Sequence, residues 1–319
     1  MRKGFLFGLA ALAAVSGGLT AAPQTVQAAG EGVPVPKFDW TFSGIFGTYD
    51  RAAAQRGLQV YREVCAGCHS LDYIAFRNLA DLGYSEDEIK AMAAEAIVVD
   101  GPNDEGEMFE REGLPFDYFP APFPNEKAAA FANNGAAPPD LSLMTKARGA
   151  GPDYLKALMG HGYEDQVSED VLQEIFTLET DKRVQAYELA LEEYQHKLEV
   201  YEDKVADGIE ANRPTEPEQP LPVESIEDLG LSDGLSFNAY FPGYGIAMAM
   251  PLFEDGVEYA DGTPATVEQM AYDVSNFLMW TAEPTLEERK GMGIKVLIFL
   301  IVFTGILYAA KRKVWADVH

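Results

Sequence analysis

The chain has 319 residues, of which 47% are hydrophobic and 11% aromatic, and this composition excludes a wholly disordered protein. Its 51 acidic residues outnumber the 24 lysines and arginines, which gives a net charge of −27. Because so acidic a surface repels phosphate backbones, the charge argues against nucleic acid as a partner and favours a basic protein. The two cysteines, Cys65 and Cys68, are too few for a disulfide-rich scaffold or a four-cysteine zinc site.

Residues 1–28 have the pattern of a secretory signal peptide. Arg2 and Lys3 form a positive start, an apolar run follows over residues 5–15, and small residues lead to a cleavage site after Ala28. The apolar run is short for a membrane span, which disfavours the alternative of a retained N-terminal anchor. We therefore predict a bacterial-type exported protein, in which residues 29–290 form a domain outside the inner membrane.

Residues 65–69 read Cys-Ala-Gly-Cys-His, which is the attachment pattern of a c-type haem. In this pattern two thiols add to the haem vinyl groups, and the histidine that follows presents its imidazole to the iron. Apolar residues at Leu58, Tyr61 and Val64 recur with a helical period, so we expect the cysteines at the end of a helix. A redox-active or structural disulfide between the two cysteines is the alternative, although the sequence lacks the βαβ context typical of redox-active pairs.

Further along, apolar residues recur in steps of three and four between positions 184 and 205. This spacing predicts an amphipathic helix of about 25 residues that lies on its own domain or pairs with another helix. A proline-rich stretch from Pro214 to Pro222 ends the helix and is typical of an extended linker. The apolar stripe consists of Val184, Tyr187, Leu191, Tyr194, Leu198, Tyr201 and Val205.

Three side chains compete for the second axial position on a haem iron. Met248 and Met250 lie within residues 241–251, where glycines and other small residues would let the backbone approach a flat cofactor closely. His161, between two glycines, is the third candidate. A thioether ligand would give a higher reduction potential than a second histidine, but the residues alone leave the three choices open.

The C-terminal end contains a second apolar segment. Residues 296–310 carry no charge, and Met292 to Ile294 extend the segment past Lys295, whose side chain can reach the membrane surface. Lys311, Arg312 and Lys313 follow, and the positive-inside rule places them in the cytoplasm. We predict a single transmembrane helix over residues 291–310, a cytoplasmic tail over 311–319, and an exported domain in the periplasm. A buried core helix, the alternative, would show a polar face.

The sequence resembles the cytochrome c1 family, the haem-bearing subunits of bacterial-type cytochrome bc1 (ubiquinol–cytochrome c reductase) complexes. The similarity covers roughly residues 40–165 and 232–316. It rests on short blocks in the family's order, which together are more specific than the haem motif alone. The similarity includes the haem motif and the basic residues that follow the C-terminal apolar segment. The other blocks are Arg56–Tyr61, Asp100–Asn103, Gly106–Phe109, Asn133–Ala136, Pro138–Ser142, Phe241–Gly243, Asp261–Thr266 and Ala282–Pro284.

The resemblance implies roles for particular residues. The family's haem methionine matches Met248, which leaves Met250 as a neighbouring decoy. Pro138 and Pro139 match the family's haem edge. Arg148 matches an arginine that binds a haem propionate, with Tyr154 as its companion, and a guanidinium suits a buried carboxylate because it can bind both oxygens.

The resemblance also implies the fold and the function. We expect a mainly α c-type cytochrome domain with one covalent haem c, no catalysis by the chain alone, and a place beside cytochrome b in a dimeric bc1 complex. An electron would arrive from the Rieske iron–sulfur protein and pass to a basic cytochrome c that docks near the acidic stretch 100–112. The alternatives are a free-standing membrane-anchored electron carrier, a haem peroxidase and a thiol–disulfide oxidoreductase.

Relative to the compact members of that family, residues 163–230 resemble an insertion. This segment contains 20 acidic and 5 basic residues, so it carries more than half of the net charge of the chain. We expect a surface elaboration with no catalytic role or, as the alternative, a docking or oligomer contact.

Overall fold

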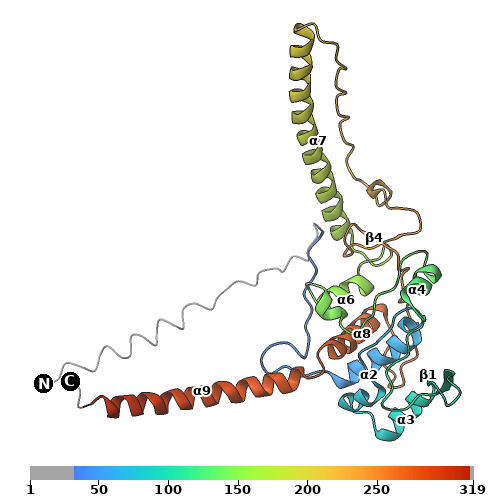
Figure 1. Cartoon of the computed structure of the whole chain (residues 1–319), viewed down its shortest axis with the longest axis vertical. Coiled ribbons are helices and arrows are strands. Elements are labelled where there is room, and N and C mark those ends of the chain that lie inside the picture. Colours follow the sequence, from blue (N-terminus) through green and yellow to red (C-terminus); the bar gives the residue numbers. More distant parts are fainter. Residues whose placement is uncertain (1–31, 317–319) are drawn as a thin grey trace.

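The computed structural model describes residues 32–316, and this part of the chain is mainly helical with two small antiparallel hairpins (Figure 1). The predicted fold class is therefore confirmed. The α-helices are α2 (Arg51–Val60), α3 (Glu86–Ala94), α4 (Glu126–Ala132), α5 (Met144–Ala147), α6 (Pro152–Gly160), α7 (Glu169–Ala206), α8 (Val267–Ala282) and α9 (Leu286–Val314). A π-helical turn η1 (Tyr61–Cys65) and two 3-10 turns, η2 (Phe76–Leu82) and η3 (Glu227–Leu229), complete the helices. Strands β1 (Ile97–Asp100) and β2 (Phe109–Glu112) pair, as do β3 (Ser236–Phe237) and β4 (Gly245–Ile246).

Helices α2 and α8 form the centre of the main core. They approach so closely that a Cβ on Gly57 would lie 2.0 Å from the backbone oxygen of Asp273, which explains the glycine. Arg56 binds the fully buried Asp273 with both forks of its guanidinium, through Nε at 2.8 Å and Nη2 at 3.0 Å. Its Nη1 lies 2.9 Å from Asp261, so this arginine ties together segments more than 200 residues apart.

The segment before α2 crosses the body and is fastened to α6. Asp153, at the start of α6, accepts hydrogen bonds from Lys37 Nζ (3.1 Å), the Phe38 backbone (3.1 Å) and Trp40 Nε1 (2.7 Å). The Trp40 ring also stacks on Tyr272 of α8, with centroids 5.0 Å apart. A buried carboxylate with this many donors fixes the position of α6, which carries Tyr154.

Helix α9 has the length and composition to cross a membrane, with a mean hydropathy of 2.2 over its most apolar window and none of that window buried. It contains the whole predicted span and stands apart from the body in Figure 1. Its first residues are fixed to the segment before α2, where Lys290 Nζ donates to Gly47 O at 3.2 Å, and to the start of α2, where Arg51 Nη2 lies 2.9 Å from Glu287 Oε2. The predicted signal peptide lies outside the described residues.

Helix α7 is longer than the sequence pattern predicts, with 38 residues in place of about 25. The apolar stripe that signals it begins only where the helix leaves the body. Nearer the body, Ile175 and Phe176 are buried in a second hydrophobic cluster together with Val223, Phe237 and Tyr244. The foot of α7 is therefore part of the packed domain, and only its outer part projects as an arm (Figure 1).

The arm is a helix covered by its own returning chain, whereas the sequence suggested contact with the domain or with another helix. The return begins where Ile209 N donates to Lys204 O (2.9 Å) and ends where Val223 N donates to Thr180 Oγ1 (2.9 Å). Helix residues 180–204 span about 36 Å, and only an extended chain covers that distance with the residues available. Prolines at every third position, Pro214, Pro217 and Pro220, are half-buried, as expected for one face of a polyproline helix lying along the half-buried middle of the stripe.

We expect the arm to be dispensable for folding and its foot to be essential. Replacing residues 185–220 with a short Gly-Ser linker should leave haem content and the melting temperature close to those of the intact chain, because both hydrophobic clusters remain. Deleting residues 166–228 removes Ile175, Phe176 and Val223 from the second cluster, at roughly 2–5 kcal/mol for each lost side chain. Haem per chain and thermal unfolding measure both effects, and loss of haem in the shorter deletion would contradict this division.

Candidate functional site

The cysteine motif lies at the end of a helix, as the sequence predicts. Helix α2 continues into the π-turn η1, where Ala66 N donates to Tyr61 O at 2.7 Å, and Cys65 is the last residue of that turn. His69 N donates to Cys65 O at 2.9 Å, so the loop through Cys68 is short and closed. Cys65 is half-buried, Cys68 is exposed, and both thiols are free. A π-turn of this kind is frequent at functional sites.

The thiols lack the features of a redox-active pair. Burial, and to a smaller extent the neighbouring Cys68, raise the pKa of the Cys65 thiol to about 12. Reactive cysteines have lowered pKa values, often at a helix N-terminus, whereas Cys65 is at a helix C-terminus. This environment counts against the thiol–disulfide oxidoreductase that the sequence left as an alternative.

His69 is held in one orientation by a backbone carbonyl. Its Nδ1 lies 2.8 Å from Pro139 O, and since a carbonyl can only accept, Nδ1 carries the hydrogen and Nε2 is left as a base. Burial lowers the pKa of His69, which keeps the ring neutral. A neutral imidazole whose other nitrogen donates to a carbonyl is the usual form of a metal-ligating histidine.

Asp140 connects the segment that contains Pro138 and Pro139 to the Cys65–His69 motif. The sequence analysis gave this residue no role. Its Oδ2 accepts from Ser70 Oγ at 2.9 Å and from Asp72 N at 2.8 Å, and its Oδ1 accepts from Ser142 N at 2.9 Å. The last of these is an Asx turn, which an aspartate two residues before a serine can signal. Asp140 thereby fixes the Pro139 carbonyl opposite the histidine ring.

The loop after β4 carries both candidate methionines. Met248 is half-buried against the same hydrophobic core as Cys65 and Ala66, and its backbone carbonyl accepts a hydrogen bond from Tyr163 Oη at 3.0 Å. The structure therefore brings two segments about 180 positions apart, the Cys65–His69 motif and this loop, to the edge of one core.

The other two axial candidates have partners of their own. Gln166 Nε2 lies 3.3 Å from Met250 Sδ. His161 Nε2 lies 2.8 Å from Glu268 Oε2, and the ring stacks on Phe38 with centroids 5.6 Å apart. Met250 and His161 line a shallow hollow with Gln166 and Glu268.

Arg148 and Tyr154 lie together, as the proposed propionate pair would require. Arg148 follows α5 and is exposed, while Tyr154 lies in the first turn of α6 and is buried. Burial raises the pKa of Tyr154, and the adjacent Arg148 guanidinium opposes that rise. An exposed guanidinium beside a buried phenol offers a carboxylate several donors from two sides.

These residues fit a haem better than a metal ion alone. Across residues 32–316, no group of three or more His, Cys, Asp or Glu side chains could hold a metal ion. The chain offers instead two thiols three residues apart, one neutral imidazole, a thioether and a cationic side chain. That donor set suits an iron whose remaining ligands come from a macrocycle with vinyl and carboxylate substituents.

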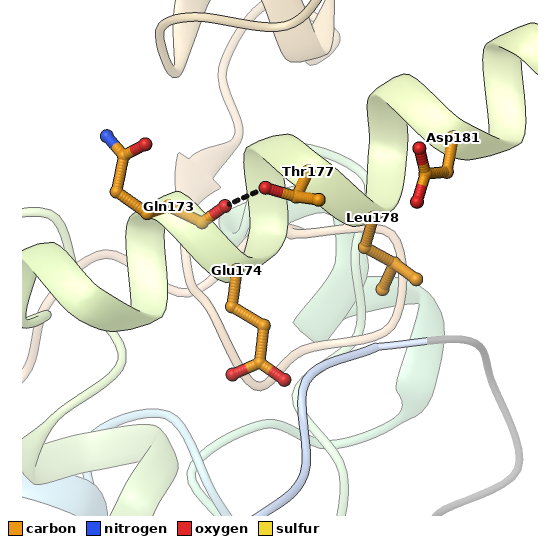
Figure 2. A pocket seen from close by; sticks show the side chains of 5 residues that line it. All are labelled: Gln173, Glu174, Thr177, Leu178 and Asp181. Carbon is orange, nitrogen blue, oxygen red and sulfur yellow. Dashed lines mark hydrogen bonds between the residues drawn. The ribbon is translucent and has the colours of Figure 1, made fainter.

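A groove along the foot of α7 is a separate feature (Figure 2). Gln173, Glu174, Thr177, Leu178 and Asp181 line it, and Thr177 Oγ1 donates to Gln173 O at 2.8 Å. Because its lining has neither thiol nor imidazole, the groove lacks the donors that haem attachment needs.

Comparison with known proteins decides the family. The sequence model of the Cytochrome C1 family matches residues 40–318. The chain belongs to the cytochrome c1 family. Membership identifies covalently bound haem c as the prosthetic group of the chain.

The relatives include bacterial and mitochondrial proteins. Cytochrome b/c1 of Bradyrhizobium diazoefficiens is 46% identical over 89% of this chain, a match that covers 36% of that longer protein. Cytochrome c1 of Rhodospirillum rubrum is 43% identical over 92% of this chain and 91% of its own length. A mitochondrial protein of Arabidopsis thaliana, named as the cytochrome c1 heme protein, is 40% identical over 97% of this chain and 83% of its own.

Proposed function

We propose that the chain is the haem c subunit of a cytochrome bc1 complex, accepting one electron from a Rieske iron–sulfur protein and passing it to a cytochrome c. The observation that carries the proposal is the neutral His69 imidazole, fixed by Pro139 O beside two free thiols. Family membership and the names of the relatives support the bc1 context.

His69 Nε2 and Met248 Sδ are the proposed axial ligands. The hydrogen bond that holds Met248's backbone supports this choice, as do the separate partners of Met250 and His161. If His69 and Met248 both bound the iron, no coordination position would remain for a substrate, which disfavours a peroxidase. A thioether ligand in addition to an imidazole would favour the reduced state and raise the potential.

A haem held at this site would supply one-electron redox chemistry. The residues of the chain hold and tune it. Cys65 and Cys68 attach it through thioethers, Arg148 and Tyr154 bind a propionate, and Pro138 and Pro139 cover an edge. Asp140 keeps the Pro139 carbonyl in place, so that the imidazole presents Nε2.

The proposed location is the periplasmic side of the inner membrane. Helix α9 supplies the anchor, with Lys311, Arg312 and Lys313 in its last turn on the cytoplasmic side. Cytochrome b is the expected neighbour of α9 within the membrane, and the parent complex is expected to be dimeric.

Capturing the full chain from membranes through a tag tests the proposal. A reduced-minus-oxidised spectrum should show c-type and b-type bands together, with a Rieske signal in the same material. A c-type band without the other two would contradict membership of a bc1 complex and indicate a free-standing carrier.

We expect electron transfer to a basic cytochrome c to slow as salt is added. The β1–β2 hairpin exposes Asp104, Glu105, Glu107 and Glu110 beside the exposed apolar side chain of Met108. Acidic residues of this kind speed encounter with a basic partner, by about tenfold or more at low salt, and are screened within about 10 Å at 0.1 M salt. Stopped-flow rates against ionic strength measure the effect.

The control separates the hairpin from the acidic arm. Neutralising the four hairpin carboxylates as amides should flatten the salt dependence, whereas neutralising Glu192, Glu193 and Glu199 on α7 should leave it unchanged. The opposite pattern would assign docking to the arm, and a rate that is flat in the unmodified chain would contradict electrostatic docking altogether.

A further inference from the structure

The turn between α6 and α7 contacts both methionines of the loop after β4. Tyr163, which is 3% exposed, donates through Oη to Met248 O at 3.0 Å and lies 3.4 Å from Ala249 O. Because a carbonyl oxygen can only accept a hydrogen bond, the Tyr163 hydroxyl is the donor in these contacts.

Gln166 makes the second contact of this turn. Its Nε2 lies 3.3 Å from Met250 Sδ, which engages a thioether that would otherwise be free to bind a metal. Gln166 N donates to Tyr163 O at 2.8 Å, so the two side chains are fixed relative to each other. The same turn thus holds the backbone at Met248 and the sulfur of Met250.

The turn is itself fixed from behind. Ala239 N donates to Gly162 O at 2.8 Å, and Asn238, which is fully buried, donates through Nδ2 to Leu158 O at 2.8 Å. A Cβ on Gly162 would lie 2.4 Å from Asn238 Oδ1, so only glycine fits there. This packing gives Tyr163 a rigid base on α6 and on the residues that follow β3.

These contacts matter because residues 248–250 read Met-Ala-Met, so two thioethers lie close together. Met248 and Met250 are half-buried whereas Ala247 and Ala249 are exposed, so the two methionines lie on the same side of the loop. A small slide of the loop would therefore offer Met250 where Met248 had been. Fixing the Met248 carbonyl and engaging the Met250 sulfur both oppose that slide.

We propose that Tyr163 and Gln166 are positioning residues that select Met248 over Met250 as the axial ligand of the haem. This inference rests on the proposed function, in which Met248 binds the iron. It assigns a role at the haem to the first residues of the segment that the sequence analysis treated as an insertion.

The test uses the complete complex with the full chain. Tyr163→Phe keeps the ring and removes the hydroxyl. Tyr49→Phe is the matched control, because Tyr49 is also buried and its hydroxyl also donates to backbone carbonyls, those of Met279 (3.3 Å) and Glu283 (2.9 Å). The readouts are the long-wavelength charge-transfer band of methionine-ligated ferric haem, the rate of carbon monoxide binding to ferrous haem, and the midpoint potential.

In Tyr163→Phe we expect a weaker methionine band, a lower potential and about a fivefold faster reaction with carbon monoxide, the effect of losing one buried hydrogen bond. Tyr49→Phe should match the unmodified complex in all three. If the unmodified complex shows the methionine band and Tyr163→Phe is identical to it, the inference about Tyr163 is wrong. If the unmodified complex lacks the band, the proposed ligand itself is wrong.

A second pair of variants tests Gln166 even if Tyr163→Phe does not assemble. Met248→Leu alone should lack the methionine band, because Gln166 still engages the sulfur of Met250. Adding Gln166→Leu to Met248→Leu should free Met250 and restore part of the band. A double variant without any band would overturn the role of Gln166 in keeping Met250 from the iron.

Discussion

A chain with both Cys65→Ser and Cys68→Ser is expected to retain no haem after denaturation and to support no quinol–cytochrome c reductase activity. The reason is that these are the only two cysteines in the chain, so no other thiol can form a thioether. Haem staining of the denatured chain and its intact mass measure attachment directly.

The single variants provide the control for this result. Each keeps one thiol, so we expect a haem held by one thioether, with an absorption band shifted to the red because one vinyl group stays conjugated with the ring. If the unmodified chain instead shows no haem and a disulfide between Cys65 and Cys68, the central assignment is wrong.

Met248→Leu is expected to have the second largest effect. Leucine keeps the volume, so the loop should still fold, but the thioether is lost. We expect the midpoint potential to fall by a few tenths of a volt, out of the roughly 0.8 V range that axial ligands span, and carbon monoxide to bind the ferrous haem. A redox titration and a carbon monoxide difference spectrum measure these changes.

Met250→Leu is the matched control, two residues away on the same loop. Because Gln166 engages the Met250 sulfur, we expect its potential and its inertness to carbon monoxide to match those of the unmodified chain. If Met250→Leu shows the large shift and Met248→Leu does not, the ligand assignment is reversed.

Local patterns predicted much of this molecule. The helical period before Cys65 placed the motif at a helix end, where the structure has it. The uncharged run near the C-terminus predicted α9, and a few short family blocks predicted a mainly helical haem domain. These features depend on residues close together in the chain or on motifs whose spacing carries the chemistry.

Contacts between distant segments were not predictable in the same way. Tyr163 and Met248 are 85 residues apart, and Gln166 and Met250 are 84 apart, so no period or motif links them. Asp140 reaches Ser70 and Asp72 across a similar distance. Such side chains acquire a role only when the fold brings them together.

The acidic segment shows a different limit of sequence analysis. Its heptad stripe marks the outer part of α7. Ile175 and Phe176 follow no such stripe, because they are buried against Val223, Phe237 and Tyr244 and not against a partner helix. The segment therefore resembled a surface elaboration from end to end, although its foot is core. The prolines of the returning chain lie along the stripe. Their spacing of three residues is typical of a polyproline helix, and a comparison limited to helical partners does not use that signal.

The measurement that tests the central claim most directly is quinol-driven reduction of the c-type haem in membranes that contain the full chain. Adding ubiquinol should reduce the c-type haem, and adding an oxidised basic cytochrome c should reoxidise that haem. Both steps should be absent in the Cys65→Ser, Cys68→Ser chain. A c-type haem that cytochrome c oxidises but ubiquinol does not reduce would contradict the account, since the chain would then carry electrons outside a bc1 complex.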